Sequence, residues 1–336
     1  MKKIRNRPFF VCNRGKICYN RSMQTVNGQN EKKGCFGSLL SDVTPAKASG
    51  LAFSTATVLP VVFSFVFLFV VSLCGLTAEG YENEDWYLYF GYLLPQLGFA
   101  VVAWLYLIYR GTPVKTALLK QKCRPKYFLV ALALQIGLLC LSELNVWFLE
   151  LLGKFGYTDT GIALPSMDGF GFVGVLLVVG VFPAIFEEII FRGAVLDGLK
   201  KTFSVPVAVL LCGALFSLYH QNPAQTLYQF CCGAAFALVA IRSGSILPTV
   251  LSHFLNNAFI VVLYKLGVES FSTPVFAVVM SVSALCLVGS LVYLIFFDKQ
   301  TPTEKTKGEG KRFFLFAAVG IAICALTWFS VLLMGM

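Results

Sequence analysis

The chain has 336 residues, of which 57% are hydrophobic and 13% are charged, whereas roughly 25% of the residues of a soluble domain carry a charge. A water-soluble globular protein is therefore excluded. The mean hydropathy is +0.75, and long apolar runs approach the ~20 residues that cross a bilayer as a helix, so we expect an all-α polytopic membrane protein. The net charge of +10 does not indicate nucleic-acid binding, because the basic residues lie in short segments between apolar runs, as in cytoplasmic loops.

The N-terminal segment differs from the rest of the chain. Residues 1–50 contain ten Lys or Arg against Glu31 and Asp42, and they lack the apolar stretch that a signal peptide needs. This composition predicts a disordered basic tail in the cytoplasm. The remaining residues, 51–336, are expected to form one transmembrane helical domain.

Nine apolar segments follow the tail. Each is expected to be helical, because backbone amides in hydrocarbon must find their hydrogen bonds within the segment. The fifth and sixth segments are short and are separated by Gln221 and Asn222 alone, so the pattern predicts a bundle of eight or nine transmembrane helices. The segments span residues 51–77, 86–109, 127–152, 169–191, 205–220, 223–241, 246–264, 273–297 and 313–335.

Basic and acidic residues alternate between the connecting segments. The connection after the first apolar segment holds four acidic residues and no basic one, whereas the next holds six basic residues and no acidic one. Because Lys and Arg are enriched in cytoplasmic loops, we expect a multi-pass protein of the cell membrane with its N-terminus in the cytoplasm and its C-terminus outside. The acidic residues are Glu79, Glu82, Glu84 and Asp85, and the basic residues are Arg110, Lys115, Lys120, Lys122, Arg124 and Lys126.

The fourth apolar segment carries Glu187, Glu188 and Arg192, although ionisable side chains are costly inside a bilayer. Glu188 and Arg192 are four residues apart and share a helix face, so they are expected to pair. Adjacent helical residues point about 100° apart, which leaves Glu187 unpaired as a candidate general base. Pro183 removes a helical hydrogen bond to the carbonyl of Val179 and should bend the helix. A pair of structural charges near a helix end is the alternative.

The two histidines of the chain, His220 and His253, both lie in predicted spans. His253 and Asn257 are four residues apart, so both can donate towards one oxygen atom. Counted at ~1.5 Å per residue from the basic ends of their helices, Glu187, His220 and Asn257 lie at depths of about 20, 24 and 16 Å. We therefore expect them to meet in mid-membrane, in a pocket that opens towards the cytoplasm, and to serve catalysis or metal binding.

These residues form three motifs that resemble a known family. The family comprises the type II CAAX prenyl endopeptidases and their bacterial relatives, the CPBP (CAAX protease and bacteriocin-processing, or Abi) intramembrane proteases. The resemblance covers about residues 165–265. Its motifs are E-E-x-x-x-R at Glu187, Glu188 and Arg192, F-x-x-x-H at Phe216 and His220, and H-x-x-x-N at His253 and Asn257.

The resemblance implies a mechanism. Glu187 with His220 would activate a water molecule for attack on a peptide carbonyl, and His253 with Asn257 would stabilise the resulting oxyanion. The ion pair beside Glu187 would be structural and would orient this base. Glu187, His220 and His253 could also supply an oxygen and two nitrogen ligands to Zn²⁺, or they could work without a metal, so no cofactor is assigned.

The resemblance thus favours an intramembrane endopeptidase that hydrolyses a peptide bond of a membrane-associated protein or peptide. The expected partners are this substrate and the lipid bilayer, and the sequence does not indicate whether the substrate is prenylated. Two alternatives stay open. One is a non-proteolytic membrane scaffold or bacteriocin immunity protein of the same fold, and the other is a proton-coupled transporter, because Glu and His chains also serve as proton relays.

Overall fold

The computed structural model describes residues 43–110, 123–159, 161, 163–268, 270–298 and 308–336. Residues 43–336 form one compact unit, and the described residues contain helices and no strand. The predicted all-α class is therefore confirmed. Most of the predicted tail, residues 1–42, and the predicted cytoplasmic lysines at 115, 120 and 122 lie outside the described residues.

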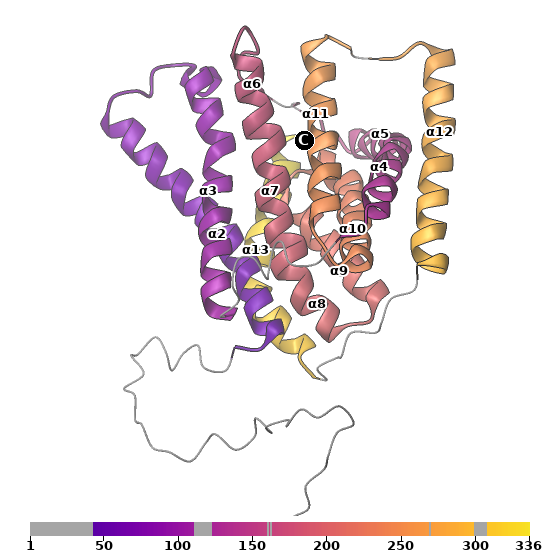
Figure 1. The fold of residues 1–336 in the computed structure, drawn as a ribbon. Coiled ribbons are helices and arrows are strands. Elements are labelled where there is room, and N and C mark those ends of the chain that lie inside the picture. Colours follow the sequence, from indigo (N-terminus) through magenta and orange to yellow (C-terminus); the bar gives the residue numbers. More distant parts are fainter. Residues whose placement is uncertain (1–42, 111–122, 160, 162, 269, 299–307) are drawn as a thin grey trace, which may run out of the picture. The chain divides into compact units, whose positions relative to one another are not determined.

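Each of the nine apolar segments contains one helical stretch of the structure (Figure 1). Eight stretches are long and apolar enough to cross a membrane, and α9, with 15 residues, is shorter. The chain is therefore a multi-pass membrane protein. The stretches are α2 (Pro45–Leu73), α3 (Asp85–Arg110), α4 to α5 (Lys126–Leu138, η4 Leu139–Leu141, Ser142–Gly153), α6 to α8 (Gly171–Val175, η5 Leu176–Val181, α7 Phe182–Glu188, η6 Ile189–Val195, Leu196–Thr202), α9 (Val205–Tyr219), η7 with α10 (Pro223–Gln225, Thr226–Ser243), α11 (Leu247–Lys265), α12 with η8 (Thr273–Val292, Tyr293–Phe297) and α13 (Gly310–Met334).

The boundaries of two stretches differ from the predicted ones. Helix α2 begins at Pro45 and not at residue 51, because the side chain of Thr44 accepts a hydrogen bond from the backbone N–H of Lys47 and caps the helix, as hydroxyl residues do at helix starts. The fourth stretch continues to Thr202, well past residue 191. Its last residues include charged side chains that end the apolar pattern but not the helix.

The helix ends that carry most of the basic residues lie on one side of the unit, which we call the basic side (towards the lower edge of Figure 1). There the starts of α2 and α13 meet through a 2.6 Å hydrogen bond from Thr44 to Glu309. The start of α4 meets the end of η8 through a 3.0 Å ion pair between Lys126 and Asp298. The described basic residues at these ends are Lys47, Arg110, Arg124, Lys126, Lys200, Lys201, Arg242, Lys311 and Arg312.

The opposite helix ends form what we call the acidic side. The backbone N–H of Ser166, in the connection before α6, donates to Asp85 at the start of α3 over 2.6 Å. The backbone N–H of Thr158, after α5, donates to the carbonyl of Gly335 at the end of α13 over 2.8 Å. Among the described residues, Lys154 and Lys265 are the two basic residues at this side.

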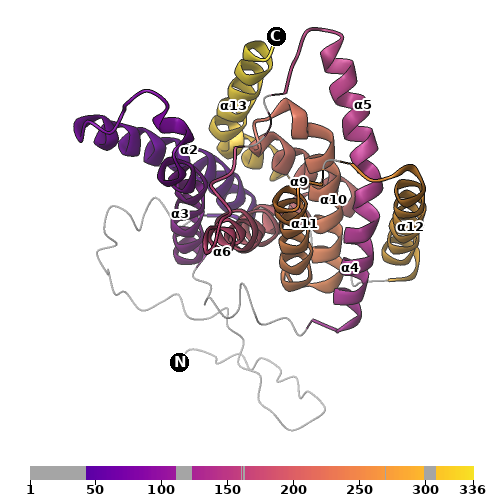
Figure 2. The same ribbon diagram turned by 90° about the horizontal axis from the view of Figure 1, so that it is seen from above.

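Close helix packing places α9 against α10. A Cβ atom on Gly233 would lie 2.9 Å from the Cα of Gly213, so these two glycines let the backbones touch. Figure 2 shows α4 and α5 along their length where α11 and α12 are seen end-on, so the α4–α5 stretch crosses these helices steeply. Helix α4 contacts α10, α11 and α12.

Candidate active site

A buried ion pair lies at the centre of the site. Glu188, on α7, is 0% exposed, and its Oε1 accepts a 2.7 Å hydrogen bond from Nη1 of Arg192, as the four-residue spacing predicts. Arg192 also donates to the carbonyl of Gly233 over 3.3 Å. Its guanidinium lies between the rings of Phe216 and Phe236, 4.3 and 5.2 Å from their centroids. The arginine charge is therefore neutralised by one carboxylate and held by two aromatic faces.

Glu188 has a second partner that helical spacing alone does not reveal. Nδ1 of His253, on α11, lies 3.0 Å from the same Oε1. An ionised carboxylate only accepts hydrogen bonds, so Nδ1 of His253 carries the hydrogen. Nε2 then faces Oε2 of Glu187 at 3.9 Å. Glu188 thus orients His253 as well as pairing with Arg192.

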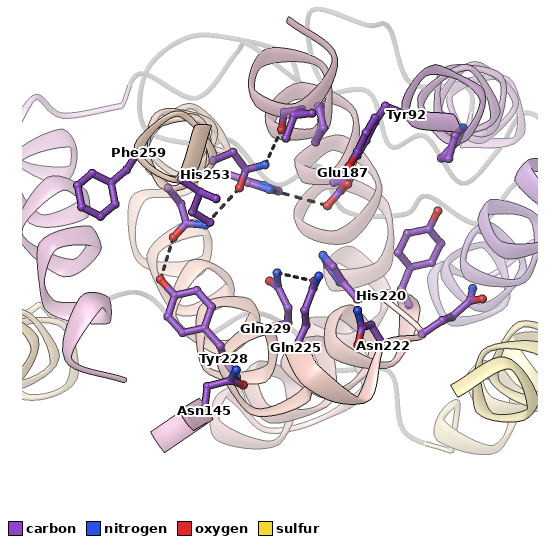
Figure 3. Close-up of a pocket in the computed structure, with 18 of the residues that line it drawn as sticks. Tyr92, Asn145, Glu187, His220, Asn222, Gln225, Tyr228, Gln229, His253 and Phe259 are labelled. Carbon is purple, nitrogen blue, oxygen red and sulfur yellow. Dashed lines mark hydrogen bonds and ion pairs between the residues drawn. The ribbon is translucent and has the colours of Figure 1, made fainter. Parts of the chain in front are cut away.

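Glu187 has a different environment from its neighbour. Glu187 is 8% exposed and lines the cavity described below, which Glu188 does not. Its Oε2, like Oε2 of Glu188, has no hydrogen-bond partner among the described residues. A buried carboxylate oxygen without a partner is unfavourable unless water or a ligand reaches it. Figure 3 shows Glu187 and His220 pointing into the same open space. A water molecule in this space would satisfy Glu187 and place a nucleophile beside it.

His220 lies at the turn between α9 and α10. Its Nδ1 is 2.8 Å from the carbonyl of Phe216, and its ring packs edge-on against that phenylalanine. Because a carbonyl accepts, Nδ1 carries the hydrogen and Nε2 of a neutral imidazole is left as an acceptor. Gln221 follows with φ of 53°, and the side chain of Asn222 accepts from the N–H of Ala224. This tight turn ends α9 directly after His220.

Asn257 binds a backbone carbonyl one turn before Pro183. Its Nδ2 donates a 2.8 Å hydrogen bond to the carbonyl of Val179, which is the carbonyl that an α-helix would join to the N–H missing from Pro183. The Oδ1 of Asn257 accepts from Nδ2 of Asn256 over 3.2 Å. One of the two N–H groups of the Asn257 amide is therefore used structurally. The oxyanion role of Asn257 stays a prediction that depends on the other N–H.

One cavity brings the four predicted catalytic residues together. It has a volume of about 1070 Å³, and Glu187, His220, His253 and Asn257 all line it. The residues come from α7, the end of α9 and α11, and the cavity is also lined by α2, α3, α5, η7, α10 and α12. The cavity is large enough for a peptide segment, since ligand pockets usually span about 300–1,000 Å³.

A polar wall of the cavity was not predicted. Oδ1 of Asn256 accepts hydrogen bonds from Nε2 of Gln135 at 2.9 Å and from the hydroxyl of Tyr228 at 2.8 Å. Nε2 of Gln229 donates to Oε1 of Gln225 over 3.4 Å, and Figure 3 shows these two amides facing the open space beside His220. The amide side chains within the apolar segments could have predicted this wall, since uncharged polar groups in membrane spans also need hydrogen-bond partners.

The cavity extends from the catalytic residues towards the acidic side, and not towards the basic helix ends from which their depth was counted. On α2, α3, α7 and α11 the lining begins at Thr57, Gln96, Glu187 and His253, and every further lining residue lies towards the acidic side. Depth counted along a helix correctly places these groups inside the layer. The depth count does not show on which side of the catalytic residues the cavity lies. That side depends on the short helix α9, which ends at Tyr219.

The donor set does not form an evident metal site. In the described part of the chain, no group of three or more His, Cys, Asp or Glu side chains is arranged to hold a metal ion. Nδ1 of His253 and Nδ1 of His220 are both engaged by protein oxygens. This leaves the two Nε2 atoms and the carboxylate of Glu187 as the atoms that could reach a metal ion, since metal-binding histidines commonly donate their other N–H to a protein oxygen.

Comparison with known proteins supports the resemblance that the three motifs indicate. Residues 169–259 match the family model for type II CAAX prenyl endopeptidases, described as Rce1-like. The match contains all three motifs and covers well under half of the 336 residues. No curated protein and no solved structure gives a significant match to the chain. The resemblance is thus confirmed over residues 169–259, and this match implies peptidase activity in general.

Proposed function

We propose that the chain is a membrane-embedded endopeptidase in which Glu187 activates water for hydrolysis of a peptide bond. The observation that supports this most strongly is the environment of Glu187. Its Oε2 is buried and has no hydrogen-bond partner among the described residues, and it faces a cavity of about 1070 Å³. A carboxylate of this kind can take a proton from water while the water oxygen attacks a carbonyl carbon.

The proposed reaction moves one proton from water to substrate. Glu187 accepts the proton, and the C–O bond forms to give a tetrahedral oxyanion. The C–N bond then breaks, and the proton passes to the leaving amine from Glu187 or through Nε2 of His220. The free N–H of Asn257 would donate to the oxyanion. His253 would donate from Nε2 when its imidazole carries hydrogen on both nitrogens. Each preorganised donor can contribute several kcal/mol in a water-poor site.

Glu188 and Arg192 act in this proposal as positioning residues. The pair fixes the charge on Glu188, and that charge fixes which nitrogen of His253 carries hydrogen. The proposed mechanism uses no metal. We also propose that the basic side faces the cytoplasm, which places the N-terminus inside and the protein in the cell membrane.

The same polar cluster in a non-proteolytic scaffold or immunity protein would still need the Glu188–Arg192–His253 contacts for packing. It would not need a second carboxylate, Glu187, at the wall of a large cavity. A proton relay would need a chain of titratable groups across the layer. In the described residues the cavity lining carries titratable carboxyl and imidazole groups at Glu187, His220 and His253, all near one level. These observations favour the peptidase.

The test uses the purified full-length protein in detergent with a random peptide library, with cleavage read by mass spectrometry. Glu187→Gln keeps the shape of the side chain and removes the base, so cleavage should fall by about 10²–10⁴-fold. Glu150→Gln, at an exposed glutamate outside the cavity lining, is the matched control and should cleave normally. Unchanged cleavage by Glu187→Gln would reject the mechanism, and loss on chelator treatment of the wild type would show that a metal is required.

A further inference from the structure

Two glutamines in the cavity lining carry hydrogen-bonding groups that the protein itself does not use. We propose that Gln225 and Gln229 bind the main chain of the substrate, so that the cavity takes an extended, unfolded peptide segment whose side chains are not selected along this wall. This inference rests on the proposed function, to which it adds two substrate-binding residues.

The asparagines of the cavity lining are largely engaged within the protein. Nδ2 of Asn145 donates to the carbonyl of Ala224 over 2.7 Å. Asn256 and Asn257 form the hydrogen bonds described above, to groups on other helical segments. These three amides join neighbouring parts of the bundle, and their role is structural.

Gln225 and Gln229 differ from these asparagines. Both side chains are partly buried, and both line the cavity. Nε2 of Gln229 donates to Oε1 of Gln225 over 3.4 Å, which is longer than the 2.9–3.0 Å of a usual N–H···O bond. Neither side chain has another hydrogen-bond partner among the described residues. Oε1 of Gln229 is therefore left to accept a hydrogen bond, and Nε2 of Gln225 is left to donate one.

The start of α10 holds this pair of glutamines close to the catalytic residues. Tyr228, which precedes Gln229, donates to Asn256 on α11 over 2.8 Å. Figure 3 shows the two glutamine amides between Tyr228 and His220, across the open space from Glu187. A peptide that lies between Glu187 and α10 therefore contacts the pair.

The spacing of the pair matches the repeat of an extended chain. Four residues along a helix rise about 6 Å, and the hydrogen-bonding groups on one side of an extended chain recur every two residues, about 6.6 Å apart. These N–H and C=O groups need partners in a water-poor space. Gln229 supplies an acceptor for them, and Gln225 supplies a donor. Main-chain hydrogen bonds of this kind hold a peptide without reading its side chains.

The cavity wall around the pair is polar and uncharged. Among the residues that the structure describes, no Lys, Arg or Asp lines the cavity. The polar lining residues of this wall are three amides and one tyrosine, at Asn222, Gln225, Tyr228 and Gln229. Such a wall does not discriminate between charged side chains of a peptide, but its amides can pair with both main-chain groups. The chemistry that this wall recognises is therefore the peptide backbone.

Kinetics with N-methylated peptides test the proposal on the purified full-length protein. The probe is a quenched fluorescent form of the library peptide that the wild type cleaves fastest, prepared as a series in which each member has one backbone amide N-methylated. Gln229→Met keeps the length of the side chain and removes its acceptor. KM should therefore rise about 3–10-fold, as expected for one neutral hydrogen bond, with little change in kcat.

The N-methylated series separates contact with the substrate from a structural role. At one position, N-methylation should raise KM of the wild type by a similar factor and leave KM of Gln229→Met unchanged, because the hydrogen bond is already absent. Gln225→Met, which removes the donor to a peptide carbonyl, should also raise KM about 3–10-fold. An unchanged KM in either variant would overturn the proposal.

Gln135→Met is the matched control. Gln135 lies on α4 outside the cavity lining and donates to Asn256 over 2.9 Å, so its replacement should lower Tm, and N-methylation should raise KM of this variant as it does in the wild type. Independent effects of Gln229→Met and N-methylation at every position would overturn the inference and leave the peptidase function in place. Absence of cleavage by the wild type would instead count against the proposed function, and this inference would fall with it.

Discussion

Replacing Glu188 by alanine should destabilise the protein far more than replacing the adjacent Glu187. Glu188 accepts hydrogen bonds from Arg192 at 2.7 Å and from His253 at 3.0 Å, and the side chains of both members of the ion pair are 0% exposed. Removing the carboxylate leaves the guanidinium charge buried without a counter-charge. Glu187 carries no such partner, so Glu187→Ala should remove cleavage and leave the fold intact.

The structure sets the size of the effect. Breaking a buried ion pair by removing one partner costs about 3–5 kcal/mol, out of a total stability that is typically 5–15 kcal/mol. Asp197 provides the matched control, since it pairs with Lys201 four residues later at 2.9 Å, but with side chains 20% and 29% exposed. A pair exposed to this degree is worth about 0–1 kcal/mol, so Asp197→Ala should cost little.

The assay is the folded fraction after size-exclusion chromatography in mild detergent, together with thermal unfolding. Glu188→Ala should give a low folded yield and a lower Tm, and Arg192→Met combined with it should recover part of the loss, because the unpaired charge is then absent. A Glu188→Ala protein as stable as Asp197→Ala would refute the reasoning. A normal yield with lost cleavage would instead mean that Glu188 is the base.

Two further predictions concern helix packing around the site. Asn257→Ala should destabilise the protein by about 1–3 kcal/mol, because it leaves the carbonyl of Val179 without its donor. The same change should cost less in a Pro183→Ala background, which restores a backbone N–H. Equal losses in both backgrounds, measured by thermal unfolding, would contradict the assigned role. Gly233→Val should separate α9 from α10 and destabilise the protein by about 1–3 kcal/mol through overpacking, because the added Cβ would lie 2.9 Å from the Cα of Gly213. An unchanged Tm would show that the hairpin is not tightly packed.

The sequence predicts those features that depend on neighbours along one helix. Apolar runs locate all nine helical stretches, because hydrocarbon imposes one backbone conformation, and four-residue spacing predicts the contact between Glu188 and Arg192. The contact between Glu188 and His253, and the one between Asn257 and Val179, join different helices. They depend on how α11 is rotated against α7 and η5, which no spacing within one segment encodes. The side of the catalytic residues on which the cavity lies is not encoded for a similar reason, since it depends on what neighbouring helices leave unfilled.

The adjacent glutamates differ because they point to different sides of the helix and so lie in different environments. The ~100° rotation between neighbours places Glu188 in the packed interior with Arg192 and His253, and places Glu187 at the wall of the cavity. Glu188 accepts hydrogen bonds from Arg192 and from Nδ1 of His253, and Nε2 of His253 is thereby aimed at Glu187. The pair that stabilises the fold thus also orients the imidazole that faces the proposed base. Arg192→Lys preserves the charge of the pair but changes its geometry. It should therefore lower kcat strongly and Tm only slightly, because a lysine keeps the counter-charge but loses the planar guanidinium that contacts two aromatic rings.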